Sequence, residues 1–87
     1  MNEDTLLEFP CEFSIKAMGF TDPDFDAIVV EIVRRHVPDI VENCTRSRPS
    51  KNGKYTAITV TIQAASKRQL DAIYQDLTDH KKVLMSL

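Results

Sequence analysis

The stretch YTAITVTIQA at residues 55–64 decides the fold of this chain. From Ile58 to Ile62, aliphatic β-branched residues alternate with threonines. Because successive side chains of a strand point to opposite faces, this spacing predicts a strand with one apolar and one polar face. The stretch therefore predicts a sheet that is covered on one side only.

Working outward, the residues before this strand predict two more strands. Phe13, Ile15 and Ala17 recur at every second position, which is the period of a strand. Residues 40–48 are less clearly patterned and are expected to form an edge strand. They lead into Pro49-Ser50-Lys51-Asn52-Gly53, where Asn-Gly supplies the positive φ of a hairpin connection.

Two stretches show the spacing of amphipathic helices. The first helix is expected to begin at Thr21 or Asp22, which can cap it, with Pro23 in its first turn. It is expected to end at Val37-Pro38. The second helix opens with a capping box, Ser66-Lys67-Arg68-Gln69. The apolar stripes are Phe25, Ile28, Val29, Ile32 and Val33 in the first helix, and Leu70, Ile73, Tyr74 and Leu77 in the second.

The remaining segments complete the order β-α-β-β-α-β. Gly19 and Phe20 are expected to turn the chain after the first strand, and residues 83–87 to form a short last strand. This order predicts an α+β, ferredoxin-like sandwich whose four-stranded antiparallel sheet has the order 4-1-3-2. Each helix has one apolar stripe, so both are expected to pack on one face and leave the other open. We assign residues 1–10 to an extended N-terminal arm and residues 11–87 to a single domain.

The composition excludes several classes of protein. With 43% hydrophobic residues, 28% charged residues and two glycines, the chain is neither disordered nor low in complexity. No apolar run approaches the ~20 residues of a membrane span. Met1-Asn2-Glu3-Asp4 is acidic where a signal peptide would be basic. We therefore expect a cytoplasmic protein that does not associate with a membrane.

The two cysteines are expected to be reduced. Cys11 lies at the start of the first predicted strand and Cys44 in the second. The third strand separates them, which places them about 9.5 Å apart. That distance is too long for a disulfide bond.

Charge is unevenly distributed along the chain, whose net charge is −2. Residues 1–44 carry 3 basic and 10 acidic side chains, whereas residues 45–87 carry 8 basic and 3 acidic ones. The topology brings the first turn, the hairpin and the last turn to one rim of the sheet, beside Asp22, Asp24 and Asp26. The basic residues expected at this rim are Arg46, Arg48, Lys51, Lys54, Lys81 and Lys82. The rim either binds an anion or acidic partner, or it neutralises the aspartates at little gain in stability.

No residue pattern indicates a catalytic or metal site. A copper carrier on this fold would need C-x-x-C in the first loop, and an acylphosphatase would need a phosphate-cradling loop with an arginine. The loop Met18-Gly19-Phe20-Thr21 has neither. His80 has no second metal ligand at a recognisable spacing. A nucleophilic Cys11 near His36 is a distant alternative. We predict a protein that is not an enzyme and that binds no metal or cofactor.

Nucleic acid is a disfavoured partner, although one segment points towards it. RNA-recognition motifs share this topology and present aromatic residues on the open sheet face. Residues 53–60, GKYTAITV, echo the basic, glycine and aromatic opening of that motif, but the later stacking positions are threonines. The alternative hypothesis is a weak binder of single-stranded nucleic acid. It would use Lys16, Arg46, Arg48, Lys51, Lys54 and Tyr55.

Residues 7–19, LEFPCEFSIKAMG, and residues 50–60, SKNGKYTAITV, carry a resemblance to a known family. IYQDL at residues 73–77 and the chain end at residues 83–87 follow at the family's spacing. The chain resembles the YbeD-like family of small bacterial proteins over nearly its whole length. The resemblance implies a ferredoxin-like sandwich similar to ACT-type regulatory domains, and no activity is established for the family.

The resemblance also suggests where a ligand would bind. ACT-type domains bind amino acids or similar effectors near the turn after their first strand, and Gly19, Thr21 and Asp22 resemble that turn. A glycine there lets a ligand approach the backbone closely, or it simply turns the chain. Asp24 departs from the glycine that ACT domains commonly carry. We therefore predict a regulatory or adaptor module for a protein partner or small effector, whose edge strands also allow a homo-oligomer.

Overall fold

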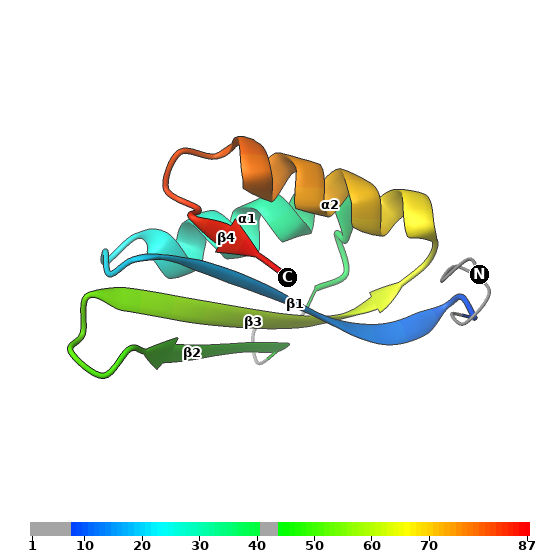
Figure 1. Ribbon diagram of the computed structural model, residues 1–87. Helices are drawn as coiled ribbons and strands as arrows, with labels where there is room; N and C mark the ends of the chain where they lie inside the picture. The colour runs from blue at the N-terminus through cyan, green and yellow to red at the C-terminus, as the bar shows by residue number, and fades with distance from the viewer. Residues whose placement is uncertain (1–7, 41–43) are drawn as a thin grey trace, which may run out of the picture.

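The elements follow each other in the predicted order. The structure is a computed structural model that describes residues 8–40 and 44–87. Its elements are β1 (Cys11–Phe20), α1 (Phe25–His36), β2 (Thr45–Pro49), β3 (Tyr55–Ala64), α2 (Lys67–Asp79) and β4 (Met85–Ser86). The strands form one antiparallel sheet in the order β2-β3-β1-β4, which confirms the predicted order. Both helices lie on the same side of this sheet (Figure 1).

The core lies between the helices and the inward face of β1 and β3. These strands pair along their whole length, from Cys11 opposite Ala64 to Phe20 opposite Tyr55. The alternating residues of the two strands, Ile15, Ala17, Ile58, Val60 and Ile62, are buried as their period predicts. The helices contribute the buried residues Phe25, Val29, Ile32, Val33, Leu70, Ile73 and Leu77. Each large side chain stabilises the fold by about 1.5–3 kcal/mol through removal from water.

The prediction that Gly19 and Phe20 turn the chain is wrong. Both residues belong to β1, where they pair with Thr56 and Tyr55. The ladder continues this far because β3 offers partners until the hairpin. The chain leaves the sheet only at Thr21, whose N–H donates to the carbonyl of Lys54 at 2.9 Å.

The first helix begins later than predicted. Its N-cap residue is Asp24, and Phe25 is the first residue of α1. Thr21 and Asp22 precede the helix, although the Oδ1 atom of Asp22 accepts a hydrogen bond from the N–H of Asp24 at 2.8 Å. Asp22 thus satisfies a backbone donor in the turn before α1, in the way that a capping residue satisfies one inside a helix.

Two predicted strands are shorter in the structure. β2 begins only at Thr45. Ile40 belongs instead to a turn, in which its N–H donates to the carbonyl of Val37. Residues 41–43 lie outside the described residues. At the C-terminus only Met85–Ser86 forms strand β4. Leu87 nevertheless exchanges two backbone hydrogen bonds with Lys16, so the chain end remains attached to β1.

The start of the second helix confirms the predicted cap. The Oγ atom of Ser66 accepts from the N–H of Gln69 at 3.1 Å. Gln69 Oε1 accepts from Ala65 N–H at 2.7 Å, and its Nε2 donates to the carbonyl of His36 at 2.8 Å. The capping residues therefore also tie α2 to the end of α1.

The predicted N-terminal arm, residues 1–10, falls mostly outside the described residues, which begin at residue 8. Residues 8–10 form no strand, and Phe9 packs against the core. Within the described chain, no helix is long and apolar enough to cross a membrane. Cys11 and Cys44 are not joined by a disulfide bond. Cys44 lies just before β2, so the prediction that it belongs to the second strand is wrong.

Candidate functional site

The face of the sheet that the helices leave open carries a row of long cationic side chains. Lys16 of β1 and Arg46 of β2 both stand opposite Thr59 of the strand between them. Arg48 stands opposite Ala57 in the next row. Since opposed residues of antiparallel strands point to the same face, all five side chains lie on the open face.

These five residues form a hollow along β3. Ala57 and Thr59 are short and form its floor, while Lys16 on one side and Arg46 and Arg48 on the other form its walls; together they enclose about 220 Å³. The spacing of strands puts the Cα atoms of Lys16 and Arg46 about 9.6 Å apart. We call this feature the cationic trough.

The cations of the trough have no carboxylate partner among the described residues. The ion pairs of the described residues lie elsewhere and join Arg35 to Glu31, His36 to Asp76, Lys67 to Asp71 and Lys82 to Asp22. Lys16, Arg46 and Arg48 are all exposed and belong to none of them. An anion ~5 Å from each would gain about 0.8 kcal/mol per cation even at the dielectric constant of water. The trough is therefore a place where an anion from outside is stabilised.

An aromatic pair lies at the hairpin end of the same face. The rings of Phe20 and Tyr55 are stacked, with centroids 5.2 Å apart and an angle of 25° between their planes. The Nζ atom of Lys54 lies 6.0 Å from the Phe20 centroid and 5.5 Å from the Tyr55 centroid. Phe20 remains 51% exposed, so one of its surfaces is open to solvent.

Phe20 is not among the site residues that the sequence predicts, because Gly19 suggests a turn at this position. The signal was present in the alternation of Lys16, Met18 and Phe20, which places all three on one face once β1 is extended. Tyr55, which the sequence did single out, proves to be its cross-strand neighbour.

At the turn that resembles an effector site, the space next to Gly19 is filled by the chain itself. A Cβ atom on Gly19 would lie 2.6 Å from the ring of Phe25 and closer still to the carbonyl oxygen of Lys82. Thr21 Oγ1 is hydrogen-bonded to Thr56 Oγ1 at 2.9 Å. Glycine at position 19 therefore permits close packing of β1 against Phe25 and Lys82. A hollow of about 340 Å³ remains beside this turn, lined by Phe20, Asp22, Lys81 and Lys82.

The carboxylate of Asp22 is also engaged, in an ion pair with Lys82. Its Oδ2 atom accepts a hydrogen bond from Lys82 Nζ at 2.8 Å. This bond holds the pKa of Asp22 below its usual 3.8 and raises the pKa of Lys82 above its usual 10.5. At this pair the acidic start of α1 is neutralised within the chain, which is the second of the two roles considered for the rim.

The basic residues predicted to lie together at one rim lie in separate parts of the structure. The loops do meet, as the bonds from Thr21 to Lys54 and from Lys82 to Asp22 require. Lys51 and Lys81 are exposed in the hairpin and the last turn. Arg46 and Arg48, by contrast, belong to the open face and not to the rim, because β2 runs along β3 in a register that the sequence did not reveal.

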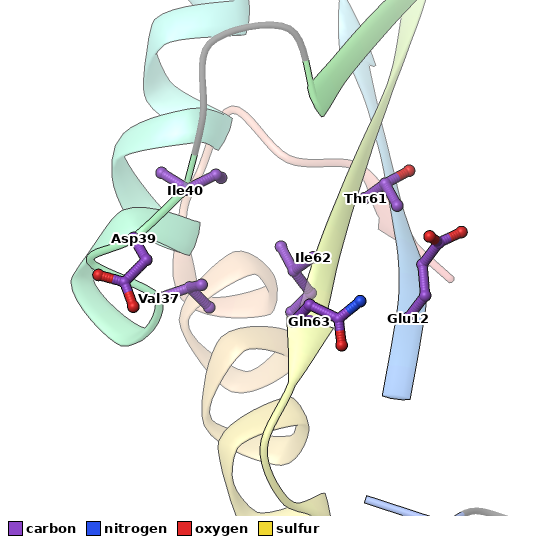
Figure 2. Close-up of a pocket in the computed structure, with 7 residues that line it drawn as sticks. All are labelled: Glu12, Val37, Asp39, Ile40, Thr61, Ile62 and Gln63. Carbon is purple, nitrogen blue, oxygen red and sulfur yellow. The ribbon is translucent and has the colours of Figure 1, made fainter. Parts of the chain in front are cut away.

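A second hollow, of about 380 Å³, lies at the far end of β3 (Figure 2). It forms where the pairing of β2 with β3 ends, at Thr45 opposite Val60. Its lining residues are Glu12, Val37, Asp39, Ile40, Thr61, Ile62 and Gln63. The apolar side chains meet between the end of α1 and β3, whereas Glu12 and Thr61 lie on the other side of the strand (Figure 2). Its polar groups diverge, so the hollow does not present a convergent site.

The histidines have structural partners. His36 Nε2 is 2.7 Å from Asp76 Oδ2, so His36 links α1 to α2. His80 Nδ1 accepts from the N–H of Lys82 at 3.1 Å. In the part of the chain that the structure describes, no group of three or more potential ligands could hold a metal ion.

Comparisons with known proteins agree with the resemblance found in the sequence. A family model described as "Protein of unknown function (DUF493)" matches residues 4–87. A UPF0250 protein of Nitrosomonas europaea is 45% identical over 87 residues, which is 100% of both chains. A UPF0250 protein of Neisseria meningitidis serogroup C is 43% identical over 86 residues, covering 99% of this chain and 94% of the relative. The predicted likeness to YbeD-like proteins is thereby confirmed.

A solved structure supports the fold. The solution structure of protein HP0495 from H. pylori matches with a TM-score of 0.75 and 18% sequence identity, covering 100% of this chain and 94% of that protein. At this identity the match concerns the fold alone. It agrees with the α+β sandwich of two helices on a four-stranded antiparallel sheet.

Proposed function

The chain belongs to the DUF493 family, whose function is unknown, and we propose that it is a non-catalytic regulatory or adaptor module of the bacterial cytoplasm. It binds an anionic partner across the open face of its sheet. The partner is an acidic segment of another protein or a small anionic effector, and the cationic trough is its binding site.

The observation that carries this proposal is the lack of carboxylate partners for Lys16, Arg46 and Arg48 within the described chain. Surface cations are usually worth little to stability, and three on adjacent strands repel one another weakly. They contribute nothing to the core, which lies on the opposite face. A cluster that does not serve the fold is best explained by a partner of opposite charge.

The regulatory part of the proposal follows the likeness to ACT-type domains drawn from the sequence. In this chain the turn after β1 is packed against Phe25 and Lys82 at Gly19, and Asp22 beside it is paired with Lys82. The cationic trough instead offers a regulatory ligand both space and charge that no carboxylate of the described residues neutralises. Domain boundaries at residues 11–87 remain part of the proposal.

A photo-crosslinking amino acid in living cells tests the proposal. We would place it at Thr61, on the open face beside the trough, and at Thr78, which is exposed on α2. The Thr61 position is expected to give a crosslinked partner that disappears when Arg46→Glu and Arg48→Glu are added. Identical products from both positions, or products unaffected by the charge reversal, would contradict the proposal.

A further inference from the structure

The aromatic pair and the cationic trough form one continuous surface. Tyr55, Ala57 and Thr59 are alternate residues of β3, so their side chains follow one another along the open face. Two residues of a strand advance about 6.7 Å. This short separation places a flat ring surface directly beside a group of cations.

The aromatic pair needs an explanation that charge alone does not supply. An acidic peptide would neutralise the trough but would leave the half-exposed ring of Phe20 unused. Nucleobases stack on aromatic side chains whatever their sequence, because every base has a π-face. The Nζ atom of Lys54 lies within 6.0 Å of both ring centroids, so a cation accompanies the aromatic pair.

The trough fits the other part of a nucleotide. Arginine presents a planar fork of donors that matches a phosphate, and lysine adds a point charge. Arg46 and Arg48 lie on one side of the trough and Lys16 lies on the other. Because Ala57 and Thr59 have small side chains, room remains between Lys16 and the two arginines. A phosphate in that room can be contacted by cations from both sides.

We propose that the open face binds a nucleotide unit, with its base on the Phe20–Tyr55 pair and its phosphate in the cationic trough. This inference rests on the proposed function, because it requires an anion in the cationic trough, and it assigns a nucleotide phosphate as that anion in place of an acidic protein segment. A base joined to a phosphate occurs both in a free nucleotide and in a single strand of nucleic acid. The structure also moves the site away from Lys51, which lies in the hairpin outside this surface.

Binding is measured with two probes at low salt. A fluorescently labelled single-stranded oligonucleotide of eight residues tests the strand, and adenosine monophosphate, followed by amide chemical shifts, tests the free nucleotide. Strand binding that weakens steeply as salt rises identifies the strand as source. Saturable binding of adenosine monophosphate that is as strong, per nucleotide, as binding of the oligonucleotide identifies the free nucleotide as source. If neither probe binds, the inference is wrong.

Variants separate the two halves of the site. Tyr55→Leu and Phe20→Leu each remove a stacking surface and keep an apolar side chain. Far-ultraviolet circular dichroism shows which of the two variants folds, and each folded variant provides the test. Each is expected to weaken binding of the better probe about tenfold. The double variant Arg46→Ser/Arg48→Ser is expected to weaken it at least tenfold. The matched control, Arg34→Ser/Arg68→Ser, removes the same charge from the helices and is expected to change binding less than twofold.

The outcomes distinguish this inference from the proposed function. Polyglutamate serves as a third probe that carries charge without bases. If Arg46→Ser/Arg48→Ser abolishes binding of polyglutamate and oligonucleotide alike, while the aromatic variants change neither, the nucleotide inference fails and the anionic-partner proposal stands. If the trough variants bind all probes as well as the control does, both are overturned.

Discussion

The two faces of the sheet are built from alternate residues of the same strands, yet they differ in every physical respect. On the helix side, Ile15 and Val60 are fully buried and pack in the core. On the open side, their neighbours Lys16 and Thr59 meet Arg46 in a solvent-filled trough. The residues that stabilise the fold and the residues to which we assign the proposed binding are therefore separate sets, one position apart along the chain.

Polar groups show the same division. Among the described residues, no buried side-chain donor or acceptor lacks a hydrogen-bond partner. Thr56, the one buried polar residue of the described chain, is hydrogen-bonded through Oγ1 to Oγ1 of Thr21. Within the described part of the chain, in contrast, the trough cations Lys16, Arg46 and Arg48 have no ion-pair partner. Substitutions on the two faces should therefore have opposite consequences, which the following predictions test.

The largest effect is expected from paired substitutions on β3. Ile58→Ala removes a side chain that is 1% exposed, and it should lower the free energy of unfolding by about 2–5 kcal/mol through lost burial and a cavity. Thr59→Ala, on the open face, should change it by less than about 0.5 kcal/mol. Urea denaturation measures both, and similar losses from the two variants would refute the division between faces.

The next largest effect is expected where β1 meets the last turn. Gly19→Ala introduces a Cβ atom against the Phe25 ring and the Lys82 carbonyl. It should lower the free energy of unfolding by about 1–3 kcal/mol, because a packed site must shift to admit it. Ser14→Ala, on the open face of the same strand, is the control and should cost much less. An unchanged midpoint of urea unfolding for Gly19→Ala would show that Gly19 does not serve packing.

A smaller effect on stability is expected from the trough itself. Arg46→Ser/Arg48→Ser should leave the free energy of unfolding within about 0.5 kcal/mol of the original protein. A slight gain would reflect relief of repulsion with Lys16. Thermal unfolding followed by circular dichroism provides the measurement. A loss as large as that of Ile58→Ala would mean that these arginines hold the fold together.

The smallest effect concerns the ion pair of Asp22 with Lys82. Because the pKa of Asp22 is lowered below 3.8, its contribution to stability is present above that pH and is lost as the carboxylate protonates on acidification. Because the pKa of Lys82 is raised above 10.5, its contribution is present below that pH and is lost as the amine deprotonates. The difference in stability between the original protein and Asp22→Asn should be constant between these limits and shrink outside them. Urea unfolding at pH 3, 7 and 11 tests this; a difference that grows at pH 3 would contradict it.

Much of the fold follows from the sequence because its periods are strong. The alternation in residues 55–64 and the two apolar stripes predict the buried face, the helices and the order of strands. The extent of β2 could not be predicted, because Thr45-Arg46-Ser47-Arg48-Pro49 has no apolar period and its register depends on pairing with β3. The sequence groups Lys16, Arg46 and Arg48 in the nucleic-acid alternative, but it places the two arginines at the rim and does not predict the trough that they form with Lys16.

The aromatic pair was missed for a different reason. A glycine in sequence indicates either a turn or a close approach of packed atoms, and the distinction depends on what lies next to it in space. At Gly19 the neighbours are Phe25, the first residue of α1, and Lys82, which lies in the turn before β4. Only the folded chain reveals that β1 continues to Phe20 and brings it beside Tyr55.

Amide chemical-shift mapping tests most directly whether the open face is the binding surface. Isotope-labelled protein would be titrated at low salt with the eight-residue oligonucleotide and, separately, with polyglutamate. The account predicts that at least one of them shifts the amides of Lys16, Arg46 and Thr59, while those of α2 stay in place. Shifts confined to the helices, or none with either probe, would contradict it.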